Sequence, residues 1–115
     1  MSKSTITIDV EMDENRVPAG ITWKATDAAN DKPQKSKAMM LAFWDGEEKT
    51  ALRIDLWIKT MMVDEMADFF FQTMMTMADT YGRATNDAEM VEEMKKFSRG
   101  FYQKFREKQM KESKA

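Results

Sequence analysis

The hydrophobic pattern of this chain changes its period once, near Lys59. Before that point, apolar and polar residues mostly alternate in short runs, which is typical of half-buried strands. After it, apolar residues recur every three or four positions, which is typical of amphipathic helices. A strand-rich half followed by a helical half predicts an α+β fold with an antiparallel sheet.

Four short runs predict four strands, and the short loops between them predict one antiparallel β-meander. The third run, KAMMLAFW, is apolar on both faces, so we expect it to be central in the sheet. Asp45-Gly46, which follows it, is typical of a hairpin turn. The segment 27–36 is polar, contains Pro33 and is expected to be a loop. The predicted strands span residues 5–12, 21–26, 37–44 and 50–58.

Two amphipathic helices are predicted over residues 63–82 and 87–108, packed on one face of the sheet within a single domain, 1–115. Asn86 and Glu89 have the spacing of a capping box for the second helix. Its apolar stripe is interrupted by Gly100, a residue that lowers helix stability. Residues 109–115 lack a continuous stripe and are expected to fray. The stripes comprise Met62, Met66, Phe69, Phe70, Thr73, Met74, Met77 and Tyr81 in the first helix, and Met90, Met94, Phe97, Phe101 and Phe105 in the second.

The composition argues against catalysis. The chain has no histidine and no cysteine, so it lacks imidazole bases, thiol nucleophiles and the usual zinc ligands. No glycine-rich phosphate-binding motif and no EF-hand motif is present. The carboxylates do not gather into a site; Asp79, if buried, is expected to pair with Arg83 one helical turn further on. We therefore predict no enzyme activity, no metal and no cofactor. A site built from carboxylates alone is the one kind of catalytic or metal site that this composition leaves open.

Charge is distributed unevenly along the chain. Residues 95–115 hold eight basic and two acidic residues, whereas residues 1–94 hold ten basic and eighteen acidic residues. A basic end suits the C-terminus of a helix, but it is also a candidate docking helix for an acidic surface or an anionic membrane. The acidic body argues against nucleic acid. The basic residues concerned are Lys95, Lys96, Arg99, Lys104 and Arg106.

Neither a membrane-spanning helix nor a secretory signal is expected. No apolar run reaches the length that a bilayer requires. The first residues, MSKSTITIDVEMD, turn acidic within ten positions and lack an apolar core. We therefore expect a cytoplasmic location, with peripheral membrane contact left open.

The segment TALRIDLW, Thr50 to Trp57, suggests a contact surface. Apolar residues at 52, 54 and 56 alternate with Arg53, Asp55 and Trp57 on the opposite face. The charged pair could belong to a ladder of cross-strand ion pairs. Alternatively, the face is an exposed aromatic patch with a polar rim, a common mark of protein contacts and of self-association. The outward face of the third strand is either Met39, Leu41 and Phe43 or Met40, Ala42 and Trp44. The candidate surface comprises Lys24, Phe43, Trp44, Arg53, Asp55 and Trp57.

A longer stretch carries a family resemblance. The elements RIDLW, VDEM, FFFQT, TMADTY and RAT, preceded by ENRVPAGITWKATD and KAMMLAFWD, resemble the GldC family of gliding-motility proteins from Bacteroidetes-type bacteria. The resemblance runs from about Glu14 to Thr85. It implies a small soluble accessory protein of gliding motility, a process linked to type IX secretion, with no established enzymatic activity or cofactor.

The hypothesis that follows is an interaction protein that binds a component of the gliding or secretion machinery and that could also form a homodimer. The alternative is a small-molecule or lipid-binding protein with a pocket between sheet and helices, lined by methionine and aromatic side chains. The thirteen methionines are compatible with both hypotheses, since methionine fills cores and also lines adaptable binding surfaces.

Overall fold

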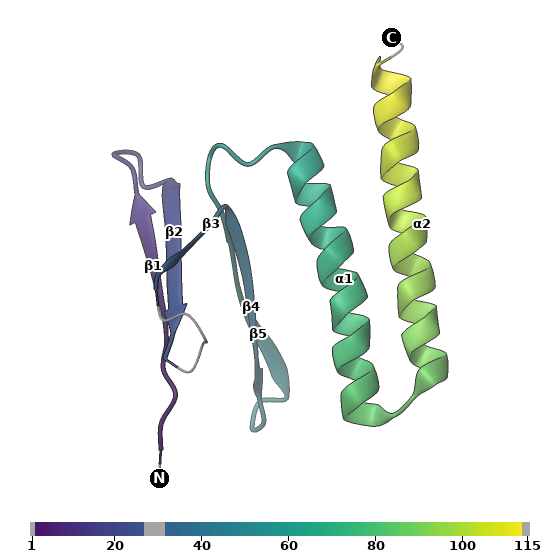
Figure 1. Ribbon diagram of the computed structural model, residues 1–115, viewed down its shortest axis with the longest axis horizontal. Coiled ribbons are helices and arrows are strands. Elements are labelled where there is room, and N and C mark those ends of the chain that lie inside the picture. Colours follow the sequence, from purple (N-terminus) through teal and green to yellow (C-terminus); the bar gives the residue numbers. More distant parts are fainter. Residues whose placement is uncertain (1, 27–31, 114–115) are drawn as a thin grey trace. The chain divides into compact units, whose positions relative to one another are not determined.

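The computed structural model describes residues 2–26 and 32–113 (Figure 1). It divides into a strand unit, Met1–Met61, and a helical unit, Met62–Ala115. The predicted α+β class, with antiparallel strands followed by two helices, is confirmed. The packing of the helices on one sheet face stays a prediction.

The strand unit contains two small antiparallel sheets rather than one four-stranded meander. The first has the order β1-β2-β3 and the second is the pair β4-β5. The prediction that the third run is a central strand is therefore wrong, because within the described residues β4 pairs with β5 alone. The bounds are Ile6–Met12 for β1, Pro18–Ala25 for β2, Gln34–Ser36 for β3, Ala38–Asp45 for β4 and Thr50–Trp57 for β5.

A bend at Lys37 divides the predicted third strand from a short strand before it. Ser36 in β3 lies opposite Ile21 in β2, whereas Ala38, just past the bend, lies opposite Trp57 in β5. The Lys37 carbonyl accepts the N–H of Ile58 at 2.8 Å, so the bend is tied to the end of β5. Part of the loop expected over residues 27–36 is thus the edge strand β3. Residues 27–31 of that expected loop lie outside the described residues.

The β1-β2 pair has the alternation that the sequence predicts. Val10 lies opposite Ile21, and Ile8 lies opposite Trp23, so the apolar residues of both strands share one face. On that face the Trp23 Nε1–H donates to Ser36 Oγ at 3.0 Å, which joins β2 to β3. Ile21, in the central strand, is only 2% exposed.

Asp13 organises the turn between β1 and β2. Its Oδ1 accepts the N–H groups of Asn15 and Val17 at 2.8 and 3.0 Å, and its Oδ2 accepts Lys59 Nζ at 3.1 Å. The bond from the Val17 N–H and then that from Lys59 lower the pKa of Asp13 below its usual value. Arg16 adopts the left-handed conformation, with φ of 62°, that closes the turn.

The two helices are longer than predicted. They are α1, Val63–Thr85, and α2, Ala88–Ser113, so α2 continues five residues past its expected end, and residues 114–115 lie outside the described residues. The Glu65 carboxylate accepts the Met62 N–H at 3.1 Å at the start of α1.

The expected capping box of α2 is wrong by one residue. Asp87 Oδ1, not the Asn86 side chain, accepts the Met90 N–H, at 3.1 Å. Asn86 instead ends α1 in the left-handed conformation, which asparagine tolerates, and its N–H donates to Gly82 O at 2.8 Å.

Small residues hold α1 and α2 together as an antiparallel hairpin, in which the helices lie side by side (Figure 1). Ala78 is 0% exposed and Ser98 is 1% exposed. The Ser98 hydroxyl donates to Met94 O at 2.9 Å, so its burial leaves no unpaired polar group. A Cβ on Gly82 would lie 2.9 Å from Val91 Cγ2, which shows how closely the helices approach near the turn.

Larger side chains join the helices on either side of these small residues. The rings of Phe71 and Tyr102 stack with centroids 4.6 Å apart. Asp79 pairs with Lys95 of α2 at 2.8 Å. Asp79 is exposed rather than buried, so the condition for its expected pairing with Arg83 is not met. Arg83 donates instead to Thr80 Oγ1 at 3.1 Å.

The hydrogen bond between Tyr102 of α2 and Asp68 of α1 predicts that the Tyr102 hydroxyl has a raised pKa. Its hydroxyl donates to the Asp68 carboxylate, and this bond, the nearby negative charge and partial desolvation raise the pKa of Tyr102 above 10.0. Because the folded pKa is the higher one, the stabilisation is fully present below the unfolded pKa and is lost as the pH rises through the folded pKa. Ultraviolet titration of the Tyr81→Phe variant, which retains Tyr102 as its single tyrosine, measures the value. Adding Asp68→Asn should lower it; an unchanged value would contradict the assigned cause.

Candidate interaction surfaces

The register of the β4-β5 hairpin defines a face that carries two tryptophans. Residues directly opposite each other share a face. Arg53 lies opposite Ala42 and Asp55 opposite Met40, which places Met40, Ala42 and Trp44 on the side of Trp57. We call this the tryptophan face; it comprises Ala38, Met40, Ala42, Trp44, Ala51, Arg53, Asp55 and Trp57.

The register also divides the candidate surface that the sequence suggests. Phe43 lies opposite Leu52, on the other face of the hairpin. Lys24 lies in β2, opposite Thr7, and so belongs to the three-stranded sheet. The four candidates that share one face are Trp44, Arg53, Asp55 and Trp57.

Arg53 and Asp55 form an ion pair along the strand instead of a ladder across strands. The Arg53 Nε–H donates to Asp55 Oδ2 at 3.0 Å, and Nη2 donates to Oδ1 at 2.9 Å. The residues opposite them, Ala42 and Met40, are uncharged, so each charge finds its partner two positions away. The hydrogen bond and charge of Asp55 raise the pKa of Arg53. The two side chains thus form a planar polar group in the middle of the face, in which the positive charge of Arg53 and the negative charge of Asp55 cancel.

The two tryptophans lie toward opposite ends of this face. Trp44 is 69% exposed and Trp57 is 56% exposed. Between them lie Met40, Ala42 and the Arg53–Asp55 pair. Exposed tryptophans around an ordered polar pair form an arrangement typical of protein contact surfaces.

The basic residues of α2 fall into two groups. Three of the five predicted docking residues have partners within the hairpin: Lys95 binds Asp79 at 2.8 Å, Arg99 binds Glu92 at 2.8 Å, and the Arg106 guanidinium lies 6.0 Å from the centroid of the Tyr102 ring. The side chains of Lys96 and Lys104 form neither a hydrogen bond nor an ion pair with any described residue.

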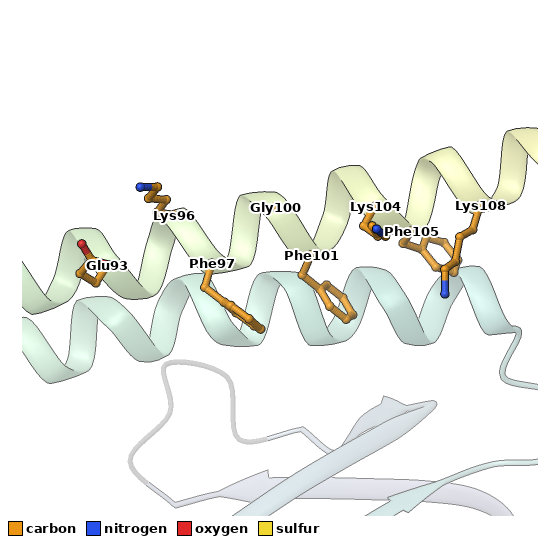
Figure 2. A pocket seen from close by; sticks show the side chains of 8 residues that line it. All are labelled: Glu93, Lys96, Phe97, Gly100, Phe101, Lys104, Phe105 and Lys108. Carbon is orange, nitrogen blue, oxygen red and sulfur yellow. The ribbon is translucent and has the colours of Figure 1, made fainter.

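Lys96 and Lys104 border an open hollow of about 670 Å³ that we call the α2 groove. Figure 2 shows the residues that line it. Phe97, Phe101 and Phe105 form its apolar floor, and Phe97 is 68% exposed. The sequence identified the phenylalanines as a helical stripe but did not indicate that lysines flank it or that Lys108 belongs with them. The lining comprises Glu93, Lys96, Phe97, Gly100, Phe101, Lys104, Phe105 and Lys108, all from α2.

Neither a metal centre nor a membrane-spanning helix is found in the described part of the chain. No three potential metal ligands come together among the described residues. None of the helices, as far as they are described, combines the length and the apolar character needed to cross a membrane. The α2 groove contains no methionine, so it differs from the methionine-lined pocket of the alternative hypothesis, which stays a prediction.

The fold and these surfaces define a small α+β protein with an exposed aromatic strand hairpin and an aromatic, basic helix. Residues 18–107 match the family model described as gliding motility-associated protein GldC-like. The chain belongs to this GldC-like family, and the resemblance seen in the sequence is confirmed. No curated protein and no solved structure matches the chain.

Proposed function

We propose that this gliding motility-associated protein acts by binding a partner protein of the gliding or secretion machinery through its tryptophan face. The observation that carries the proposal is the pair of exposed tryptophans on either side of the Arg53–Asp55 ion pair. The family gives the process, gliding motility. The proposed mode of action is docking through the exposed surface, in the cytoplasm and without a catalytic step.

The surface chemistry favours a protein over a small ligand. Tryptophan is enriched among the residues that dominate binding energy at protein interfaces, because a large rigid ring loses little conformational entropy. Arg53 and Asp55 are already bonded to each other, so a partner that covers them does not leave a lone buried charge. Their fixed geometry leaves guanidinium and carboxylate edges that can set the orientation of the partner.

The test is a crosslinking pull-down in the native host, with three versions of the chain as bait. We expect the unmodified bait to capture a gliding or secretion component. We expect Trp57→Ala to reduce that capture at least about tenfold, since truncating a tryptophan that dominates an interface costs about 2 kcal/mol or more. Phe43→Ala is the matched control, because Phe43 is an exposed aromatic residue on the opposite face of the same hairpin.

Two results would contradict the proposal. If Trp57→Ala captures the component as well as the unmodified bait does, the tryptophan face is not the docking site. If Phe43→Ala loses it and Trp57→Ala does not, the contact belongs to the opposite face of the hairpin. Circular dichroism and tryptophan emission of each bait establish that the variants are folded.

A further inference from the structure

The residues that line the α2 groove follow the three-and-four spacing of one helix face, so their positions read the same in both directions along the helix. From the midpoint between Gly100 and Phe101, Glu93 and Lys108 lie equally far in opposite directions, and Lys96 mirrors Phe105 in the same way. Phe97 likewise mirrors Lys104. We propose that the groove binds the same groove of a second copy of this chain, with the two α2 helices antiparallel about a two-fold axis near Gly100.

Gly100 provides the space for such a contact. It lies inside a 26-residue helix, where glycine is less stable than alanine, and its φ is not positive, so the backbone does not require it. A Cβ at this position would meet nothing within 4 Å in the described chain, in contrast to Gly82, where Val91 is in the way. The open position next to Phe101 can accept the Phe101 ring of a second copy, as a knob enters a hole between packed helices.

The charges at the two ends of the groove complement each other in this orientation. An antiparallel pair places Glu93 of one copy beside Lys108 of the other, and the two-fold axis repeats that ion pair at the far end. Lys104 of one copy then lies beside Phe97 of the other, where its apolar stem covers the exposed ring. Glu93, Lys104 and Lys108 form no ion pair with any described residue, so all three are available for these contacts.

An anionic lipid surface is a less suitable occupant. The groove is basic toward Lys108, but Glu93 occupies its other end, where it would be repelled by lipid phosphates. A second copy satisfies both ends with opposite charges. The inference is independent of the docking surface on β4-β5, because it concerns a different unit of the chain.

Sedimentation equilibrium of the full chain tests the proposal through charge reversal. We expect Glu93→Lys and Lys108→Glu each to weaken dimerisation more than tenfold, since each places like charges together at both ends of the interface. The double variant, with the charges exchanged, should recover most of the affinity. Lys111→Glu is the control: it makes the same charge change on α2 outside the groove and should leave the dimer intact.

Gly100→Ala gives a second, independent readout with effects of opposite sign. Because nothing in the described chain meets the added methyl group, the variant should melt at a higher temperature when measured as a monomer at low concentration. The same methyl group should weaken the dimer severalfold, because it fills the space that the Phe101 ring of the second copy enters. An unweakened dimer would overturn the inferred contact at Gly100.

Crosslinking determines the orientation, and the chain lacks cysteine, so each introduced thiol is unique. A mixture of Glu93→Cys and Lys108→Cys chains treated with a short bis-maleimide should give the mixed product. In a parallel dimer these positions are about 22 Å apart, at about 1.5 Å per residue, and like-with-like products would dominate instead. That result would overturn the antiparallel pairing. A chain that stays monomeric up to millimolar concentration would overturn the proposal, as would Phe97-dependent binding to phosphatidylserine vesicles without dimers.

Discussion

Replacing Ala78 with leucine should lower the free energy of unfolding of the helical hairpin by about 3 kcal/mol, the upper part of the usual range for overpacking. Ala78 is 0% exposed, in the helix that packs against the equally buried Ser98 of α2. Three additional carbon atoms cannot fit there unless α1 and α2 move apart. Separation would also weaken the Phe71–Tyr102 stack and the Asp79–Lys95 ion pair, which bridge the same two helices.

Chemical denaturation followed by the helical circular dichroism signal measures the effect of Ala78→Leu. Ala84→Leu is the matched control, because Ala84 is exposed on the same helix and the change should be nearly neutral. All three tryptophans lie in the strand unit, so tryptophan emission reports that unit separately. Equal stability of the Ala78 and Ala84 variants would show that the helices have room at Ala78.

The helices were predictable from sequence because their apolar stripes are long and follow one period. What the pattern did not give is which residues are deepest. Ser98 is polar and does not belong to the predicted apolar stripe, yet it is buried. Its small side chain lets the helices approach, and its hydroxyl donates to the carbonyl of Met94 one turn earlier. Phe97, a member of the predicted stripe, is largely exposed. Size at the helix contact, rather than hydrophobicity, decides burial here.

The division of the strands into two sheets could not be predicted, because it depends on one bend. The strand β3 is the polar tripeptide Gln34–Ser36, which has neither alternation nor β-branched residues. It forms because β2 offers it a free edge, a pairing between segments distant in sequence. A reader of the sequence who does not expect β3 takes the next run, residues 37–44, as the third strand of the same sheet.

The candidate surfaces were predicted only in part, because their composition also depends on contacts between segments distant in sequence. The alternation in TALRIDLW places Arg53, Asp55 and Trp57 on one face, but only the register with β4 assigns Trp44 to that face and Phe43 to the other. On α2, the charge run identifies the basic helix but does not separate neutralised residues from free ones. Lys95 is neutralised by an ion pair with Asp79 of α1, and this pair depends on how α1 packs against α2.

Replacing Ile21 with alanine should destabilise the strand unit by about 3 kcal/mol, within the range for large-to-small changes at buried sites. Ile21 is the only buried side chain among the described residues of that unit, so its loss removes most of what that small core contains. It lies in the central strand, between Val10 of β1 and Ser36 of β3, and so contributes to both strand pairs. The adjacent Trp23 ring, bonded to Ser36, should lose its fixed environment at the same time.

Tryptophan emission during denaturation measures the effect of Ile21→Ala, and Ile6→Ala is the control on the same face of the same sheet. Ile6 is largely exposed, so its truncation should cost well under 1 kcal/mol. Ile21→Val, which removes one methylene group, should fall between the two, near 1 kcal/mol. Equal effects of truncation at Ile6 and Ile21 would mean that stability of the strand unit is spread over its surface residues, and that Ile21 has no special place in its core.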